Sequence, residues 1–157
     1  MADKKNPKSL SREHWKDEPE EHDFPAAADY LGLLVGKIRA ERTVALLKAA
    51  PTETHKAKDL LRASASEALT GDNEHVDADL EKVANGEKLS PVLLVRGRPL
   101  VIVDGYHRIC ASHLIDENAE VPCRVVNLPA PRRTRGAKKA GGAKKAGAAA
   151  PAPAPAG

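Results

Sequence analysis

The sequence predicts a small α/β domain of mixed α+β type. Three observations carry this prediction: helically spaced apolar residues between positions 23 and 50, short β-branched apolar runs after position 88, and a further helical stretch between two of those runs. The resulting order of helix, strand, strand, helix and strand is typical of mixed α/β architectures. The chain has 157 residues, which is the usual size of a single domain.

Residues 23–56 are expected to form a helical N-terminal region. Asp23 can cap a helix, and Pro25 suits a first-turn position, where its missing N–H is not needed. Gly36 weakens the middle of this region, so the sequence allows one helix to about residue 50 or two helices with a break near Gly36. Four apolar residues fall on one face of the first part: Tyr30, Leu33, Leu34 and Ile38.

Residues 57–128 are expected to form the α/β domain itself. The first segment, 57–64, fits either a helix turn or a short strand. A short helix should follow over 76–88, with a left-handed cap at Asn85-Gly86. The remaining elements are a hairpin of two strands (89–95 and 100–104), a helix (107–115, with Ile109, Ala111, Leu114 and Ile115 buried) and a last strand (121–126).

Both ends of the chain are expected to be disordered. Residues 1–22 are nearly all charged and polar, with Trp15 as the one anchor able to dock on the domain. Residues 129–157 form a tail rich in Lys, Ala and Pro, which carries seven basic groups and no acidic one. Residues 1–130 then hold 18 basic against 22 acidic groups. The tail fits weak nucleic-acid contact through residues 132–145, or a solubilising role, or docking on the acidic domain.

The stretch Asp-Gly-Tyr-His-Arg connects a predicted strand to a predicted helix. Gly105 permits a tight turn, and the backbone N–H groups that open the helix have no partner within it. His107 and Arg108 place cationic side chains on the first turn, which is favourable when an anion such as phosphate lies between them. In the alternative reading, Arg108 pairs with Asp104 or Asp59, and His107 caps a backbone carbonyl.

Asp104 and His107 are the candidate catalytic residues. Asp104 adjoins the turn and could hold Mg²⁺ or orient His107, as phosphoryl transfer requires. Capping the following helix is an equally good role for Asp104. No metal ligand is predicted, because Cys110, His113 and Cys123 lack the paired short spacings of structural zinc sites.

The stretch from 89 to 126 resembles the ParB/sulfiredoxin-like superfamily, and the looser resemblance covers residues 57–127. It rests on the hairpin, on Asp-Gly-X-His-Arg with Ala three residues after the Arg, and on the closing Val-Pro-Cys-Arg-Val-Val strand. The resemblance implies a ParB/sulfiredoxin-type fold and a nucleotide site at Gly105, Tyr106, His107 and Arg108. Sulfiredoxins carry their reactive Cys where this chain has Tyr106, so the repair of sulfinic acids is not expected. The partition proteins of the superfamily bind CTP, and its free-serine kinases have Asp-Gly-His-His-Arg at this turn.

The same resemblance places Lys58, Asp59 and Arg62 on the first strand of the fold. There they could face the nucleotide, although an ordinary half-exposed strand is the favoured explanation. Ser90, before the next strand, could bind the nucleotide or cap the strand entry.

The leading hypothesis is therefore a protein that binds a nucleotide or another phosphate ligand, such as ATP, ADP or CTP with Mg²⁺. It would act as a phosphotransferase or a nucleotide hydrolase. The alternative is a non-catalytic binding module that contacts DNA through its basic tail. A nuclease ranks last, because the sequence shows no carboxylate cluster for a metal. Two cysteines and no apolar run of membrane-spanning length indicate a cytoplasmic protein without a membrane partner.

Overall fold

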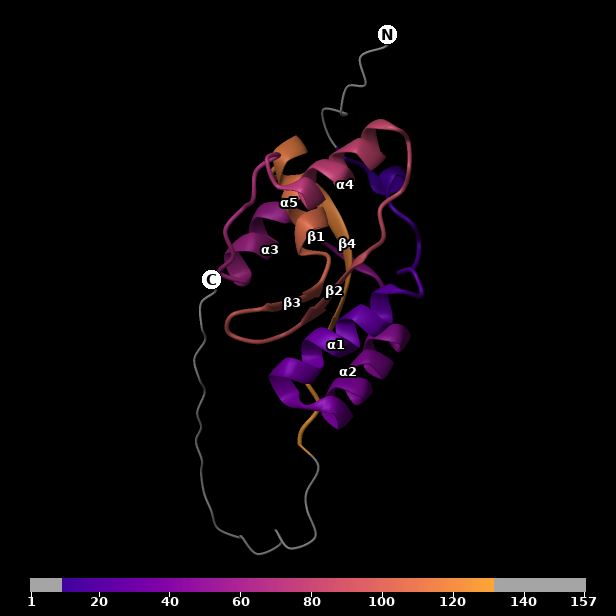
Figure 1. Ribbon diagram of the computed structural model, residues 1–157, viewed down its shortest axis with the longest axis vertical. Helices are drawn as coiled ribbons and strands as arrows, with labels where there is room; N and C mark the ends of the chain where they lie inside the picture. The colour runs from indigo at the N-terminus through magenta and orange to yellow at the C-terminus, as the bar shows by residue number, and fades with distance from the viewer. Residues whose placement is uncertain (1–9, 132–157) are drawn as a thin grey trace, which may run out of the picture.

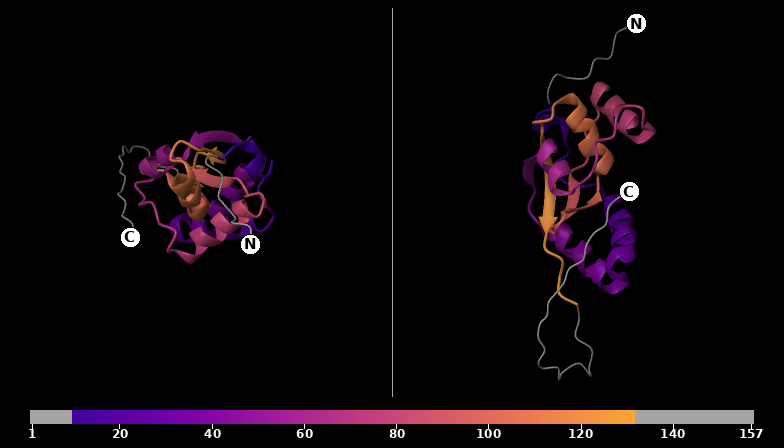
Figure 2. Two further views of the ribbon diagram at one scale, coloured as in Figure 1. Left: turned by 90° about the horizontal axis from the view of Figure 1, so that it is seen from above. Right: turned by 90° about the vertical axis from the view of Figure 1, so that its left-hand side faces the viewer.

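The computed structural model describes residues 10–131 and confirms the mixed α+β class. A four-stranded sheet lies between two layers of helices (Figures 1 and 2). The helices are α1 (Asp23–Val35), α2 (Lys37–Ala49), α3 (Ala57–Ala63), α4 (Glu74–Ala84) and α5 (Tyr106–Ile115), after a 3₁₀ turn at Arg12–His14. The strands are β1 (Glu53–Lys56), β2 (Val92–Val95), β3 (Val101–Asp104) and β4 (Glu120–Val126). The structure thus has the predicted succession of elements after residue 73.

The sheet has the strand order β1-β4-β2-β3. β2 and β3 form the predicted antiparallel hairpin, β4 runs parallel to β2, and β1 pairs antiparallel with β4. Every residue of β2 is buried, and its side chains alternate between the two faces. Val92 and Leu94 join the core under α3, α4 and α5, whereas Leu93 and Val95 join the core under α1 and α2.

The N-terminal helices form a hairpin that breaks at Gly36, as one of the two predicted alternatives requires. Gly36 has a φ of +85°, and its N–H donates to the carbonyl of Gly32 and closes α1. The prediction of which face of α1 is buried is wrong, however. Its buried residues are Asp23, Phe24, Ala27 and Leu31. The four residues expected together on one face are all exposed, and Leu33 retains 87 % of its accessible surface.

The lead predicted as disordered over 1–22 is wrong for residues 10–22, which pack along the domain. Trp15 is 1 % exposed and forms a bridge with Leu89, just before β2. The N–H of Lys16 donates to the Leu89 carbonyl at 2.8 Å, and the Leu89 N–H donates to the His14 carbonyl at 2.9 Å. Trp15 therefore docks as an anchor and holds the lead beside the sheet.

Two predicted boundaries also change. Residues 53–56, assigned to the helical region, form the edge strand β1, so this region belongs to the same sheet as the rest. Residues 57–63 form a helix, which is one of the two structures predicted for this segment, and not the first strand that the resemblance implies. In α5, Leu114 is 44 % exposed instead of buried, while Ile109 and Ala111 are buried as expected. The predicted cap at Asn85-Gly86 is present, with Gly86 at a φ of +81°.

Disorder is also predicted for residues 1–9 and for the basic tail. Residues 1–9 and 132–157, which include nearly all of that tail, lie outside the described residues. Within residues 10–131, no helix is both long enough and apolar enough to cross a membrane.

Candidate functional site

The turn between β3 and α5 is a tight connection that only glycine can make. Gly105 has a φ of +107°, and a Cβ at this position would lie 2.4 Å from Val92 Cγ1, so only glycine fits. The first backbone bond of α5 runs from the Ile109 N–H to the Gly105 carbonyl at 3.0 Å. The N–H groups of residues 106–108 thus precede the helical ladder and carry the positive end of the helix dipole.

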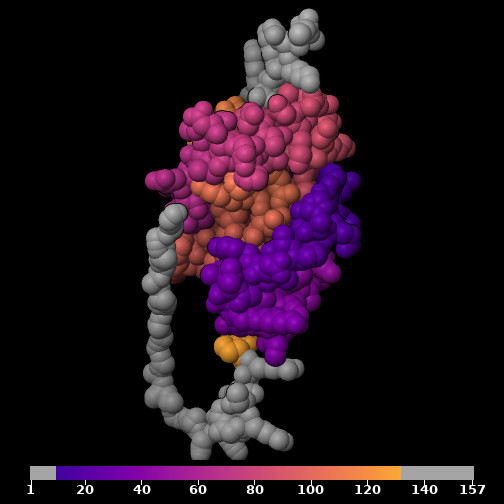
Figure 3. Space-filling view, viewed as in Figure 1, coloured from indigo at the N-terminus to yellow at the C-terminus, as the bar shows by residue number. Residues whose placement is uncertain are grey.

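This turn opens into a cleft of about 690 Å³, which is within the usual size range of ligand pockets. Its walls come from the N-terminal lead and the start of α1, from α4, and from the β3–α5 turn. In Figure 3 the β3–α5 segment, in orange, reaches the surface between the indigo N-terminal part of the chain and the pink α4 region. The charged and titratable lining residues are Lys16, Glu20, His22, Asp23, His75, Asp79, Lys82, Glu87, Lys88, Asp104, His107 and Arg108.

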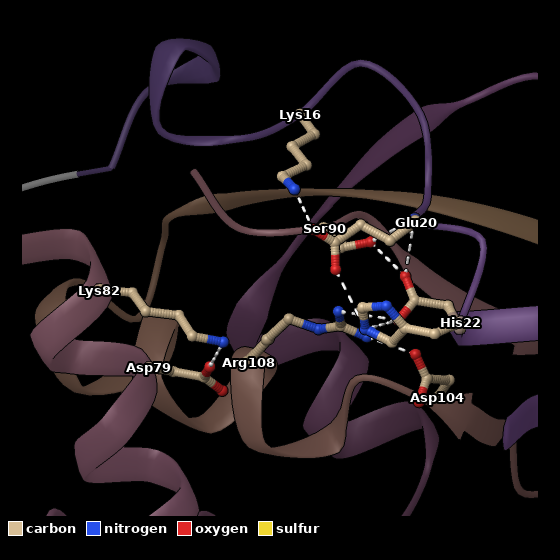
Figure 4. Close-up of polar contacts among 9 residues, drawn as sticks. Lys16, Glu20, His22, Asp79, Lys82, Ser90, Asp104 and Arg108 are labelled. Atoms are coloured by element: carbon tan, nitrogen blue, oxygen red, sulfur yellow. Dashed lines mark hydrogen bonds and ion pairs between the residues drawn. The ribbon is translucent and has the colours of Figure 1, made fainter. Parts of the chain in front are cut away.

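Arg108 is the centre of a polar network at the floor of the cleft (Figure 4). One guanidinium nitrogen lies 2.5 Å from Asp104 Oδ2, and the other lies 3.7 Å from Oδ1 of the buried Asp23. Asp23 Oδ2 in turn accepts hydrogen bonds from the Ser90 hydroxyl and, at 3.0 Å, from the Glu20 N–H. The Ser90 hydroxyl also accepts from the Glu20 N–H at 3.1 Å. The lead, α1, the segment before β2, β3 and α5 are therefore joined through one set of hydrogen bonds and ion pairs.

Burial changes the protonation chemistry of the cleft. Desolvation raises the pKa of Asp79 and of Asp104, while the charge of Arg108 opposes this effect on both. Desolvation, followed by the nearby His75, lowers the pKa of His107, whose ring lies 4.8 Å from the His75 ring. His107 is therefore uncharged near pH 7 and can accept a proton there.

Five of the predicted site residues meet in this cleft. They are Ser90, Asp104, Gly105, His107 and Arg108. Arg108 pairs with Asp104, as the alternative reading of the sequence proposed, and the N-cap of α5 is Gly105 rather than Asp104.

Tyr106 turns away from the cleft. Its hydroxyl donates to the Glu67 carbonyl, and its ring packs against the core under α3, α4 and α5. Its backbone N–H belongs to the turn, but its side chain does not line the cleft.

Lys58, Asp59 and Arg62 do not join the other predicted residues. All three lie on α3, and none of them lines the cleft. Asp59 and Arg62 form an exposed ion pair at 3.6 Å. The first strand of the sheet ends before them, so the placement inferred from the resemblance is wrong for these three residues.

Several cleft residues escaped the sequence analysis. Lys16, Glu20 and His22 lie in the lead that was expected to be disordered, and Asp79 and Lys82 lie on α4. The available signal was Trp15, because a lone aromatic residue in a charged segment can fix that segment against the domain. Comparisons with protein-family models, with curated proteins and with solved structures returned no match to this chain.

Proposed function

We propose that the protein binds a nucleotide or another phosphate-bearing ligand, together with Mg²⁺, in the cleft at the β3–α5 turn. The observation that carries the proposal is the turn itself. Gly105 connects the end of β3 directly to the start of α5, and no side chain caps the opening N–H groups of the helix. A helix start of this kind favours phosphate oxygens. The resemblance of residues 57–127 to the ParB/sulfiredoxin-like superfamily supports the same ligand class.

The charge balance of the cleft supports a metal–phosphate complex rather than a bare phosphate. The lining contains four Lys or Arg residues and five Asp or Glu residues. A free polyphosphate would meet several carboxylates, whereas bound Mg²⁺ would neutralise part of its charge and be attracted by them. Lys82 lines the cleft, and its side chain is 52 % exposed. It could bind a phosphate oxygen if it gave up its ion pair with Asp79, which measures 3.6 Å.

The groups of a phosphotransferase or a nucleotide hydrolase are also present in this cleft. Phosphoryl transfer needs positioned positive charge and a group that accepts the proton of the attacking hydroxyl or water. Arg108 and Lys82 supply positive charge. His107, with its lowered pKa, would be the base, and Asp104 would position Arg108 through their 2.5 Å contact.

Calorimetric titration of the full chain with ATP, ADP and CTP, with and without Mg²⁺, tests the proposal. We expect nucleotide binding that requires Mg²⁺. The Lys82→Gln variant should bind roughly tenfold more weakly, because it loses one charged hydrogen bond to the phosphate. Lys58→Gln is the matched control, because Lys58 lies on α3 outside the cleft. Absence of binding by all three nucleotides under both conditions, or equal weakening by the two variants, would overturn the proposal.

The second candidate function is a binding module attached to DNA by the basic tail. The seven basic groups after position 131, with no acidic residue among them, favour salt-dependent attraction to nucleic acid. A chain truncated after residue 131 should lose retention on DNA at low salt. Unchanged retention would exclude this role for the tail.

A further inference from the structure

Three side chains at the wall of the cleft converge on one point. Glu20 Oε2 lies 3.0 Å from His22 Nε2, and His22 Nε2 lies 3.5 Å from Asp23 Oδ1. The three ligand atoms all lie within 4.8 Å of one another. Around a metal with bonds of about 2.1 Å, neighbouring ligands are about 3.0 Å apart in octahedral and about 3.4 Å apart in tetrahedral geometry. The two short separations match these values.

The remaining oxygens of both carboxylates are held by other groups. Asp23 Oδ2 accepts from the Ser90 hydroxyl and the Glu20 N–H, and Asp23 Oδ1 lies near both His22 and, at 3.7 Å, Arg108. Glu20 Oε1 is paired with Lys16, and Glu20 Oε2 lies near His22 (Figure 4). Support of this kind, in which other groups hold the second oxygen of each carboxylate, is usual for metal ligands in proteins.

The three side chains of the cluster run from the buried start of α1 to the open side of the cleft. The Asp23 side chain is 4 % exposed at the start of α1, and the Glu20 side chain is 32 % exposed. His22, at 77 %, forms the open side of the cluster. All three residues line the same cleft as the β3–α5 turn, so further coordination positions would face that space.

We propose that Glu20, His22 and Asp23 form a binding site for a divalent transition-metal ion at the mouth of the cleft. One imidazole nitrogen with two carboxylate oxygens suits Mn²⁺, Fe²⁺ or Zn²⁺ better than Mg²⁺, which prefers oxygen ligands alone. Water or a phosphate oxygen of the ligand would complete the coordination. The site goes beyond the proposed function and does not depend on it, since its three ligands come from the protein.

The competing arrangement is a direct contact of His22 with both carboxylates and no metal. Arg108, 3.7 Å from Asp23 Oδ1, and Lys16, on Glu20, both place positive charge near the point of convergence. A metal ion at this point would be repelled by these two cations. The arrangement without metal predicts no metal binding, so the experiment separates the two.

The test is a titration of the full chain with Mn²⁺ alone, followed by the electron paramagnetic resonance signal of the free ion. We expect one bound Mn²⁺ per chain, with a ¹⁴N coupling from the coordinated imidazole in the pulsed spectrum. His22→Gln should remove that coupling and weaken binding by roughly tenfold or more, and Glu20→Gln should weaken it similarly. Because His22 is exposed and Glu20 is partly exposed, both variants should fold, which their melting temperatures will show.

His55→Gln is the matched control. His55 makes a comparable contact with Glu53 at 2.6 Å, but the pair lies on β1, away from the cleft. This variant should bind Mn²⁺ as the unaltered chain does. No binding of Mn²⁺ at millimolar concentration, or equal binding by His22→Gln and the unaltered chain, would overturn the metal site. Because no nucleotide is present, these outcomes leave the nucleotide titrations as a separate test of the proposed function.

Discussion

Replacement of Gly105 by alanine should be among the most damaging small changes in this protein. Two independent costs add at this position. A left-handed backbone costs an L-residue about 1–2 kcal/mol, and Gly105 has a φ of +107°. The new Cβ would also lie 2.4 Å from Val92 Cγ1 and 2.8 Å from Val92 Cβ. Overpacking of a core typically costs about 1–3 kcal/mol.

We therefore expect Gly105→Ala to lower the free energy of unfolding by about 2–5 kcal/mol, the sum of the two costs. The matched control is Gly86→Ala. Gly86 ends α4 with a left-handed φ of +81°, but a Cβ there would meet no atom within 4 Å. This variant pays the backbone cost alone, about 1–2 kcal/mol. The difference between the two variants therefore measures the steric cost of approaching Val92.

Urea unfolding followed by tryptophan fluorescence can measure both values. Trp15 is the single tryptophan of the chain and is 1 % exposed, so its emission should shift when the lead and the core separate. Val92→Ala should partly rescue Gly105→Ala, because it removes Cγ1 but leaves the Val92 Cβ at 2.8 Å. If Gly105→Ala and Gly86→Ala destabilise the protein equally, the close packing of the turn on β2 is refuted.

Three further predictions follow from the described structure. Burial, and after it the nearby His75, lowers the pKa of His107 below its usual value of about 6.5. As the pH falls, this imidazole is therefore protonated in the unfolded chain before it is protonated in the folded one, and the free energy of unfolding decreases below about pH 6.5. His107→Gln should reduce this loss in urea unfolding at pH 7 and 5.5, and an unchanged slope would contradict burial of the ring. Leu31→Ala should cost about 2–5 kcal/mol and Leu33→Ala less than about 0.5 kcal/mol, because Leu31 is 1 % and Leu33 87 % exposed; similar unfolding energies would contradict the placement of α1. Burial raises the pKa of Cys123 to about 12, so this thiol should resist a disulfide reagent at pH 8 until urea is added, and rapid labelling of the folded chain would show the burial to be wrong.

Local chemistry explains which predictions from the sequence hold. The hairpin of β2 and β3, the break at Gly36 and the cap at Gly86 each depend on residues close together in the chain. The turn at Gly105 is of the same kind, because strand, glycine and helix follow one another directly. Backbone preferences and short apolar patterns were therefore sufficient to predict the β3–α5 turn and its residues.

Long-range packing decided the rest. Exposed Leu33 and buried Leu31 cannot be told apart by hydrophobicity, because the contact with the sheet selects which face of α1 is covered. Trp15 fixes the lead through Leu89, 74 positions later, and so brings Asp23 within reach of Arg108.

The sequence by itself thus determined the α+β class, the central hairpin and the strand-turn-helix at residues 104–108. Only the tertiary structure decided which side chains surround that turn. It moved Lys58, Asp59 and Arg62 away on α3 and brought the lead in. The physical reason is that a turn depends on the conformational limits of adjacent residues, whereas a cleft depends on which distant surfaces bury each other.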